Sequence, residues 1–293
     1  MTIKNNMPTC VIVSCGVMLL ALCLTLVGLG VNLGIDFAGG LSMQFDLGQT
    51  VTQADVSAAL ANSDYNVTIQ GARRTEALIR IKSVDENSVQ GIQADVEAKL
   101  LAAYPACAAV GDVNYVGPVA GATLIKNAIM AVLIAAALML VYIAVRFDFN
   151  SGLAAVIGLV HDVLIMLSFM VILRNFVEMN SSFIAAMLTI VGYSINNTIV
   201  IFDRIRENVR RMSGSAREEV VNRSVKECLG RTVNTTLTTL ITIVTLYILG
   251  VDSIKEFALP IIVGIVSGVY SANMINGYVW AALEEHKRKP KKA

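Results

Sequence analysis

One apolar stretch of the chain, residues 151–173, carries two titratable side chains near its middle, His161 and Asp162. Hydrocarbon disfavours a charged carboxylate, so an acid there holds a proton more readily and can exchange it near neutral pH, where imidazole also titrates. Adjacent helical residues point about 100° apart, so the two side chains are expected to face different neighbours. The pair indicates ion transfer. One alternative is open: Asp162 could hold hydroxyl groups or a cation of another helix as a structural link.

A second polar cluster lies in a later apolar run, where the sequence GYSINNT includes Ser194, Asn196, Asn197 and Thr198. Polar groups in hydrocarbon need partners. Tyr193 and Ser194 share a helical face with Asn197, because they precede it by one turn. We therefore expect this helix to pack against other polar helices rather than against lipid.

A row of hydroxyl groups begins beside a permanently charged residue, Arg231. The threonines that follow recur at the spacing of one helical face. They are Thr235, Thr238, Thr242 and Thr245. Such a stripe could serve an ion path, but threonine can also bond to its own helix backbone, and an arginine near a helix end can extend to lipid phosphates.

The composition is that of a polytopic membrane protein, because 55% of the 293 residues are hydrophobic, only 15% are charged and the mean hydropathy is +0.66. A net charge of +1 argues against a nucleic-acid partner. No nucleophile–base pair, nucleotide loop or metal-ligand cluster is visible in the sequence, so we expect no enzyme, no metal site and no cofactor. Six runs are long enough to cross a bilayer core of roughly 30 Å as helices. They are residues 11–35, 123–145, 151–173, 179–202, 232–250 and 257–283.

Basic residues in the short connections set the expected orientation. The loop 203–231 is rich in arginine and the tail 284–293 in lysine, whereas the short loops of the other side offer only Arg174 and Lys255. The N-terminal residues 1–10 and the tail are therefore both expected in the cytoplasm. The tail could also contact anionic membrane lipids, although a role in fixing the topology is the simpler explanation.

The large polar segment between the first two spans, residues 36–122, would then lie outside the cytoplasm. Its stretch LSMQFDL alternates as a strand, and TQADVSAALAN begins with a threonine cap and continues as a helix. NVTIQGA and ALIRIKS are typical of two strands, a helical pattern then runs to Pro105, and VGDVNYVG is typical of a last strand. The order βαββαβ predicts a small ferredoxin-like α+β domain.

Seven different short motifs follow one another along nearly the whole chain. They are GIDFAGG at 34–40, VGPVAG at 116–121, RFDF at 146–149, HDV at 161–163, GYSINNTIVIFDRIREN at 192–208, RTVNTTLTTL at 231–240 and GIVSGVYS at 264–271. Together, at these places on six spans, they resemble the SecF family, the smaller membrane component of the bacterial SecDF protein-export complex. That family is part of the resistance-nodulation-division transporter superfamily.

The resemblance implies a multi-pass subunit of the bacterial cytoplasmic (inner) membrane that works with SecD beside the SecYEG channel, with YajC as a further partner. It would use a proton or sodium gradient to assist late translocation of a preprotein. It also implies an ion-coupling role for Arg231. The candidate ion-coupling residues are Asp162, His161, Asn196, Asn197, Arg231 and Thr235. Two alternatives are open: a half-transporter of lipids or small molecules that acts as a homodimer, and a scaffold that only stabilises SecD.

The chain departs from the family at one informative position. The family pattern most often has Asn-Asp-Thr where this chain has Asn196, Asn197 and Thr198. An amide cannot bind and release a proton near neutral pH, although its oxygen can ligate a cation. Either SecD supplies the essential carboxylates, or Asp162 takes over, or a different ion is used. We favour the first, because half of a two-part machine need not carry every site.

The remaining motif residues are expected to be structural. Gly34, Gly39 and Gly40 let the chain turn sharply from the first span into a strand. Asp36 would cap backbone amides at the membrane surface.

The other structural assignments concern helix contacts. Gly192 opens the amide-rich motif, and Asp203 with Arg204 would form a salt-bridged collar with Asp148 or the helix 217–229. A seam of small residues for close helix contact is predicted in the last span. It consists of Gly264, Gly268 and Ala272.

Overall fold

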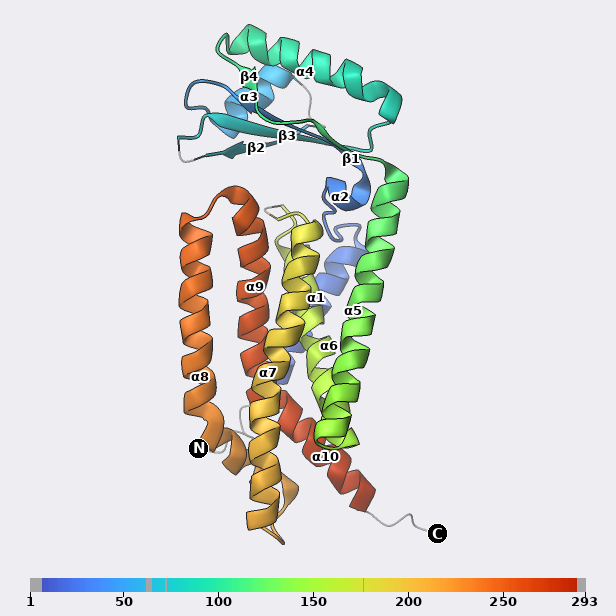
Figure 1. Ribbon diagram of the computed structural model, residues 1–293, viewed down its shortest axis with the longest axis vertical. Coiled ribbons are helices and arrows are strands. Elements are labelled where there is room, and N and C mark those ends of the chain that lie inside the picture. Colours follow the sequence, from blue (N-terminus) through green and yellow to red (C-terminus); the bar gives the residue numbers. More distant parts are fainter. Residues whose placement is uncertain (1–6, 62–64, 72, 176, 289–293) are drawn as a thin grey trace.

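The computed structural model describes residues 7–61, 65–71, 73–175 and 177–288. Figure 1 shows two parts, a bundle of long helices and a small sheet domain stacked on one end of it. The long helices are α1 (Met7–Leu26), α5 (Pro118–Arg146), α6 (Phe149–Ile172), α7 (Ser181–Arg211), α8 (Arg217–Leu249), α9 (Asp252–Ser271) and α10 (Gly277–Arg288). Six helical stretches among the described residues are long and apolar enough to cross a membrane, with α9 and α10 forming the last one. The predicted fold class is confirmed.

The sheet domain follows the predicted ferredoxin-like order, except that two short strands replace the single last strand expected over residues 110–117. Its elements are α2 (Ile35–Ala38), β1 (Gly40–Asp46), α3 (Gln53–Leu60), β2 (Asn66–Gln70), β3 (Glu76–Lys82), α4 (Val89–Ala103), β4 (Ala108–Ala109) and β5 (Asn114–Val116). The strands pair in the order β2-β3-β1-β4, with β5 also on β1, and every pairing is antiparallel. Figure 1 shows α3 and α4 on the outer face of the sheet, so its other face looks toward the bundle.

Local signals explain the start and the core of this domain. Alternate residues of β1, among them Leu41, Met43 and Phe45, are buried and pack under the two helices. The predicted threonine cap of α3 is confirmed. Thr52 accepts a hydrogen bond from the backbone N–H of Asp55, whose carboxylate accepts one from the Thr52 N–H at 3.0 Å.

Several helix ends differ from the expected bounds. The first helix ends at Leu26, short of the expected residue 35, and Gly28 follows it with a φ of +86°. The expected cytoplasmic loop 203–231 is largely helical, because α7 continues to Arg211 and α8 begins at Arg217. The last span is interrupted by a π-helical turn, Ala272–Asn276, and Figure 1 shows α10 leaning away from the line of α9. Part of the two predicted termini, residues 1–6 and 289–293, lies outside the described residues.

The turn into the sheet domain depends on glycine at two of the three predicted positions, because Gly34 has an ordinary extended backbone with a φ of −71°. Gly39 has a φ of +74° and Gly40 a φ of +149°. A Cβ on Gly40 would overlap the carbonyl oxygen of Ile81 and lie 3.0 Å from the Cα of Lys82, both on the neighbouring strand. Asp36 caps a helix as expected, because its Oδ2 accepts a hydrogen bond of 2.9 Å from the backbone N–H of Ser181 at the start of α7.

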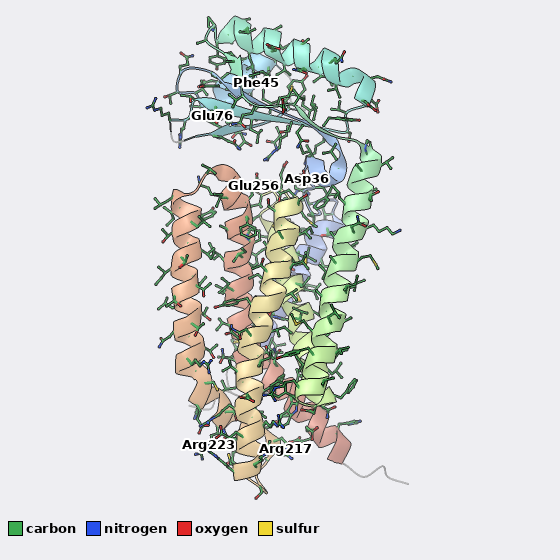
Figure 2. All side chains as sticks on the ribbon, in the orientation of Figure 1. Asp36, Phe45, Glu76, Arg217, Arg223 and Glu256 are labelled. Carbon is green, nitrogen blue, oxygen red and sulfur yellow. The ribbon has the colours of Figure 1, made fainter. Side chains whose placement is uncertain are left out.

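A charged cluster ties the sheet to the bundle. Glu178, just before α7, accepts hydrogen bonds from Asn66 at 2.8 Å and Arg80 at 3.4 Å, and pairs with Lys82 at 3.2 Å. Arg80 also bonds to Glu256 of α9 at 2.9 Å. Figure 2 shows Glu256 and Asp36 at this junction, on the bundle side of the sheet. The domain is therefore held in a defined position above the helices.

Candidate functional site

Asp162 lies in the centre of the helix bundle and is fully buried, with 0% of its surface exposed. Its Oδ1 accepts hydrogen bonds from Ser267 of α9 at 2.7 Å and faces the His161 Nδ1 at 3.0 Å. Its Oδ2 accepts from Ser194 of α7 at 2.6 Å and from Ser271 at 2.9 Å. Two neighbouring helices thus direct three hydroxyl donors at one carboxylate, which satisfies both oxygens, and the His161 imidazole also contacts it.

Small residues allow this convergence. The predicted seam on α9 is confirmed as a close helix contact, because a Cβ on Gly268 would lie 3.1 Å from the Cβ of Ser194. A Cβ on Gly264 would lie 2.5 Å from Ile190 and 2.9 Å from the sulfur of Met166. Only glycine lets α9 approach α7 and α6 this closely. The hydroxyl groups of α9 reach Asp162 as a result.

His161 extends the site toward α1. Its Nε2 lies 2.9 Å from the Ser14 hydroxyl, which in turn bonds to the hydroxyl of Tyr270. Tyr270 donates to the carbonyl oxygen of Cys10 at 2.8 Å, and its ring meets the imidazole edge-on with centroids 5.4 Å apart. His161 and Asp162 face different helices, as expected from the sequence, and they also contact each other.

The hydroxyl groups beside His161 form a chain that ends on α1. Tyr270 donates its only proton to the Cys10 carbonyl, so a consistent pattern has Ser14 donating to Tyr270 and accepting from the His161 Nε2. The Asp162 centre is thereby connected to α1 through His161.

A second polar layer lies one helical turn from Asp162, on the side away from the sheet domain. Asn276, within the π-helical turn, donates a hydrogen bond of 2.8 Å to Thr198. A Cβ on Gly158 of α6 would lie 2.6 Å from the Asn276 Cγ, so glycine is needed to admit this amide. Asn197 is 4% exposed, and its Nδ2 has no partner among the described residues. π-Helical turns such as Ala272–Asn276 are frequent at functional sites.

The other candidates point away from Asp162. Asn196 and Gly192 lie on the exposed face of α7, and a Cβ on Gly192 would meet nothing within 4 Å. Arg231 and Thr235 lie on the exposed face of α8, where Thr235 bonds to the Arg231 carbonyl. The remaining threonines of the stripe also bond to their own helix. The structure of this chain alone therefore does not join Arg231 or Thr235 to the Asp162 centre.

The predicted collar is present in part. Arg204 pairs with Glu207 of its own helix and with Glu227 of α8 at 2.6 Å. Asp203 is exposed. Asp148 takes no part in the collar, because its carboxylate caps the start of α6 at the Ser151 N–H, 3.0 Å away.

Sequence reasoning missed four members of the centre, Ser14, Ser267, Tyr270 and Ser271. The last span contained a signal, since Ser267 and Ser271 are one turn apart in GIVSGVYS and share a helical face. No comparable pattern marks Ser14, which lies 147 positions before its partner His161.

Fold and site define a class of protein, a multi-pass helical membrane protein with a ferredoxin-like domain after its first span and a carboxylate buried among its helices. The family model "Protein export membrane protein SecD/SecF, C-terminal" matches residues 96–286, and "SecD/SecF GG Motif" matches residues 25–51. The chain belongs to the SecF family of protein translocase subunits and is a multi-pass inner-membrane protein.

Named relatives agree with this placement. The chain is 37% identical over 269 residues to the protein translocase subunit SecF of Alicyclobacillus acidocaldarius. The alignment covers 89% of this chain and 85% of the relative. It is also 37% identical over 245 residues to SecF of Thermodesulfovibrio yellowstonii, and this alignment covers 82% of this chain and 80% of the relative.

Solved structures show the same fold. The crystal structure of SecDF, a translocon-associated membrane protein from Thermus thermophilus, superposes with a TM-score of 0.77 at 34% identity. A structure of SecDF in a super-membrane-facing form gives 0.70 at 30% identity. The first match covers 96% of this chain but 38% of that SecDF chain, so this protein corresponds to one part of the larger protein.

Proposed function

We propose that this chain pairs with SecD and uses a transmembrane ion gradient to assist late SecYEG-dependent translocation of a preprotein. The observation that carries the proposal is Asp162, a fully buried carboxylate that receives hydroxyl groups from two other spans. Ionisable groups at this depth are costly, and they are retained where an ion is bound or moved. SecYEG, YajC and the preprotein are the further partners that the family predicts.

Asp162 is the group in this chain that we expect to bind the ion. Asn197 is buried nearby but has no titratable group. Ser194, which bonds to Asp162, precedes Asn197 by one turn on the same helix, so the two positions belong to one polar region. Either a proton on Asp162 or a sodium ion between Asp162 and the three serine oxygens satisfies the ligand chemistry.

Polar groups left on the outside of the bundle support SecD as the partner. Asn196 on α7, and Arg231 and Asn234 on α8, are exposed in this chain. Amide and guanidinium groups facing lipid are unfavourable, so a second polar helical surface is expected to cover them. Arg231 and Thr235 would then contribute to ion coupling in the complex. The basic residues of α7 and α8 lie at the end opposite the sheet domain, which supports cytoplasmic termini.

The test is preprotein export into vesicles that contain SecYEG, SecD and this chain, under a proton gradient and then a sodium gradient. Asp162→Asn should abolish the acceleration by the effective gradient, and Ser267→Ala should weaken it because a ligand is lost. Ser168→Ala is the matched control, since Ser168 is buried on α6 but bonds only to its own helix, at the Leu164 carbonyl.

The same experiment separates the alternatives. Full acceleration by Asp162→Asn protein at normal level would remove Asp162 from the coupling step. Full export by both Asp162→Asn and Arg231→Ala proteins would favour the scaffold role. Normal export with impaired lipid or small-molecule movement after depletion of the chain would favour the half-transporter.

A further inference from the structure

A cavity of about 590 Å³ lies at the end of the bundle opposite the sheet domain, between the α5–α6 turn, α7, the start of α8, and α10. Its walls combine aromatic rings and basic groups, and they are separate from the Asp162 centre. The residues that matter here are Phe149, Phe202, Arg206, Arg210, Arg217 and Trp280. Figure 2 shows Arg217 at this end of the helices.

Two donor groups in the cavity wall have no acceptor among the described residues. Trp280 is 6% exposed, and its indole N–H has no hydrogen-bond partner in the described part of the chain. The Nε of Arg217 is likewise buried and unpartnered there. A buried donor left unpaired is unfavourable, so both positions favour a ligand that brings acceptors.

The arginines of the cavity differ from their neighbours in ion pairing. Within the described ranges, no carboxylate pairs with Arg206, Arg210 or Arg217, whereas the neighbouring Arg211 pairs with Glu207 at 2.5 Å and Arg223 pairs with Glu227 at 3.0 Å.

Two carboxylates also line the cavity, and each accepts a hydrogen bond from a residue at the start of α6. Asp148 caps α6 at Ser151, and Glu284 accepts from Asn150. The cavity lining contains three arginines and two acidic residues, so it carries a net positive charge.

We propose that this cavity binds a phosphate group, carried either by an anionic lipid headgroup or by a soluble phosphate compound. A phosphate presents several anionic acceptor oxygens, which match the fork of a guanidinium and the single N–H of an indole. The aromatic walls, with Phe149 65% exposed, suit the apolar part of a lipid next to that phosphate. This inference goes beyond the proposed function and does not rest on it.

Binding can be measured by the fluorescence of Trp280, because it is the only tryptophan of the chain. Its fluorescence is followed in the purified full-length protein in detergent while one of three probes is added: phosphatidylglycerol, inorganic phosphate, or diacylglycerol as the phosphate-free control. A saturable change with phosphatidylglycerol alone identifies a lipid site, and one with inorganic phosphate as well identifies a site for soluble phosphates. No saturable change with either, or an equal change with diacylglycerol, overturns the proposal.

Variants connect the signal to the charges. Arg210→Gln and Arg217→Gln should each weaken binding roughly 10-fold, because one charge-assisted hydrogen bond is lost. Arg211→Gln is the matched control beside Arg210, and its affinity should stay unchanged. Equal weakening by Arg210→Gln and Arg211→Gln would show general attraction to a basic surface and overturn the site. Trp280→Phe, which removes the indole N–H together with the fused five-membered ring, should reduce the rise in Tm that the bound probe gives.

Discussion

The substitution Gly40→Ala is expected to loosen the sheet domain far more than other glycine substitutions at positive φ. A residue with a Cβ in the left-handed region costs about 1–2 kcal/mol. At Gly40 the Cβ would also overlap the Ile81 carbonyl, so the first pairs of β1 and β3 must separate. That movement breaks bonds such as Ser83 N–H to the Gly39 carbonyl, 3.1 Å long, at about 1 kcal/mol each. With about two such bonds lost, the backbone strain and the broken bonds total about 3–4 kcal/mol.

Gly111→Ala is the matched control. Gly111 lies in the same domain with a φ of +74°, but a Cβ there would meet nothing within 4 Å, so only the backbone strain of about 1–2 kcal/mol applies. Hydrogen exchange of the β1 and β3 amides, measured by mass spectrometry on the whole protein, reports the opening free energy of the sheet. A difference of about 2 kcal/mol means roughly 30-fold faster exchange for Gly40→Ala than for Gly111→Ala. Exchange rates within about 3-fold of each other would refute the steric argument, because that ratio is less than 1 kcal/mol.

Three further predictions concern packing, domain position and pH. Gly158→Ala should lower the stability of the bundle by about 1–3 kcal/mol because its Cβ would displace the Asn276 amide, whereas Gly192→Ala should not; thermal unfolding followed by circular dichroism compares them. Glu178→Gln should loosen the sheet domain from the bundle because Arg80 and Lys82 lose their shared carboxylate; broader spin-label distances across the junction check this, and unchanged distances contradict it. Hydrogen bonds from Thr52 hold the pKa of Asp55 below its ordinary value of 3.8, so this contribution to stability is present above that pH and is lost as pH falls below it. Thr52→Ala should therefore reduce the acid sensitivity of hydrogen exchange in α3, and an unchanged pH profile would show that the capping box does not contribute.

The sequence by itself determined the six spans, the βαββαβ order, the glycine turn and the burial of Asp162. Each of these follows from local rules: hydropathy over a bilayer thickness, strand alternation, and the backbone freedom of glycine. Even the inward face of Ser194 and Asn197 could be predicted, because helical spacing places them together.

Tertiary structure alone decided which groups meet. Periodicity tells which residues share a face but does not tell which helix that face contacts. Ser267 and Ser271 can bond to Asp162 only because the glycine seam lets α9 pack against α7. Ser14 can bond to His161 only because α1 packs beside α6. The threonine stripe, equally regular in sequence, faces outward and bonds to its own helix, because no described helix of this chain covers that face.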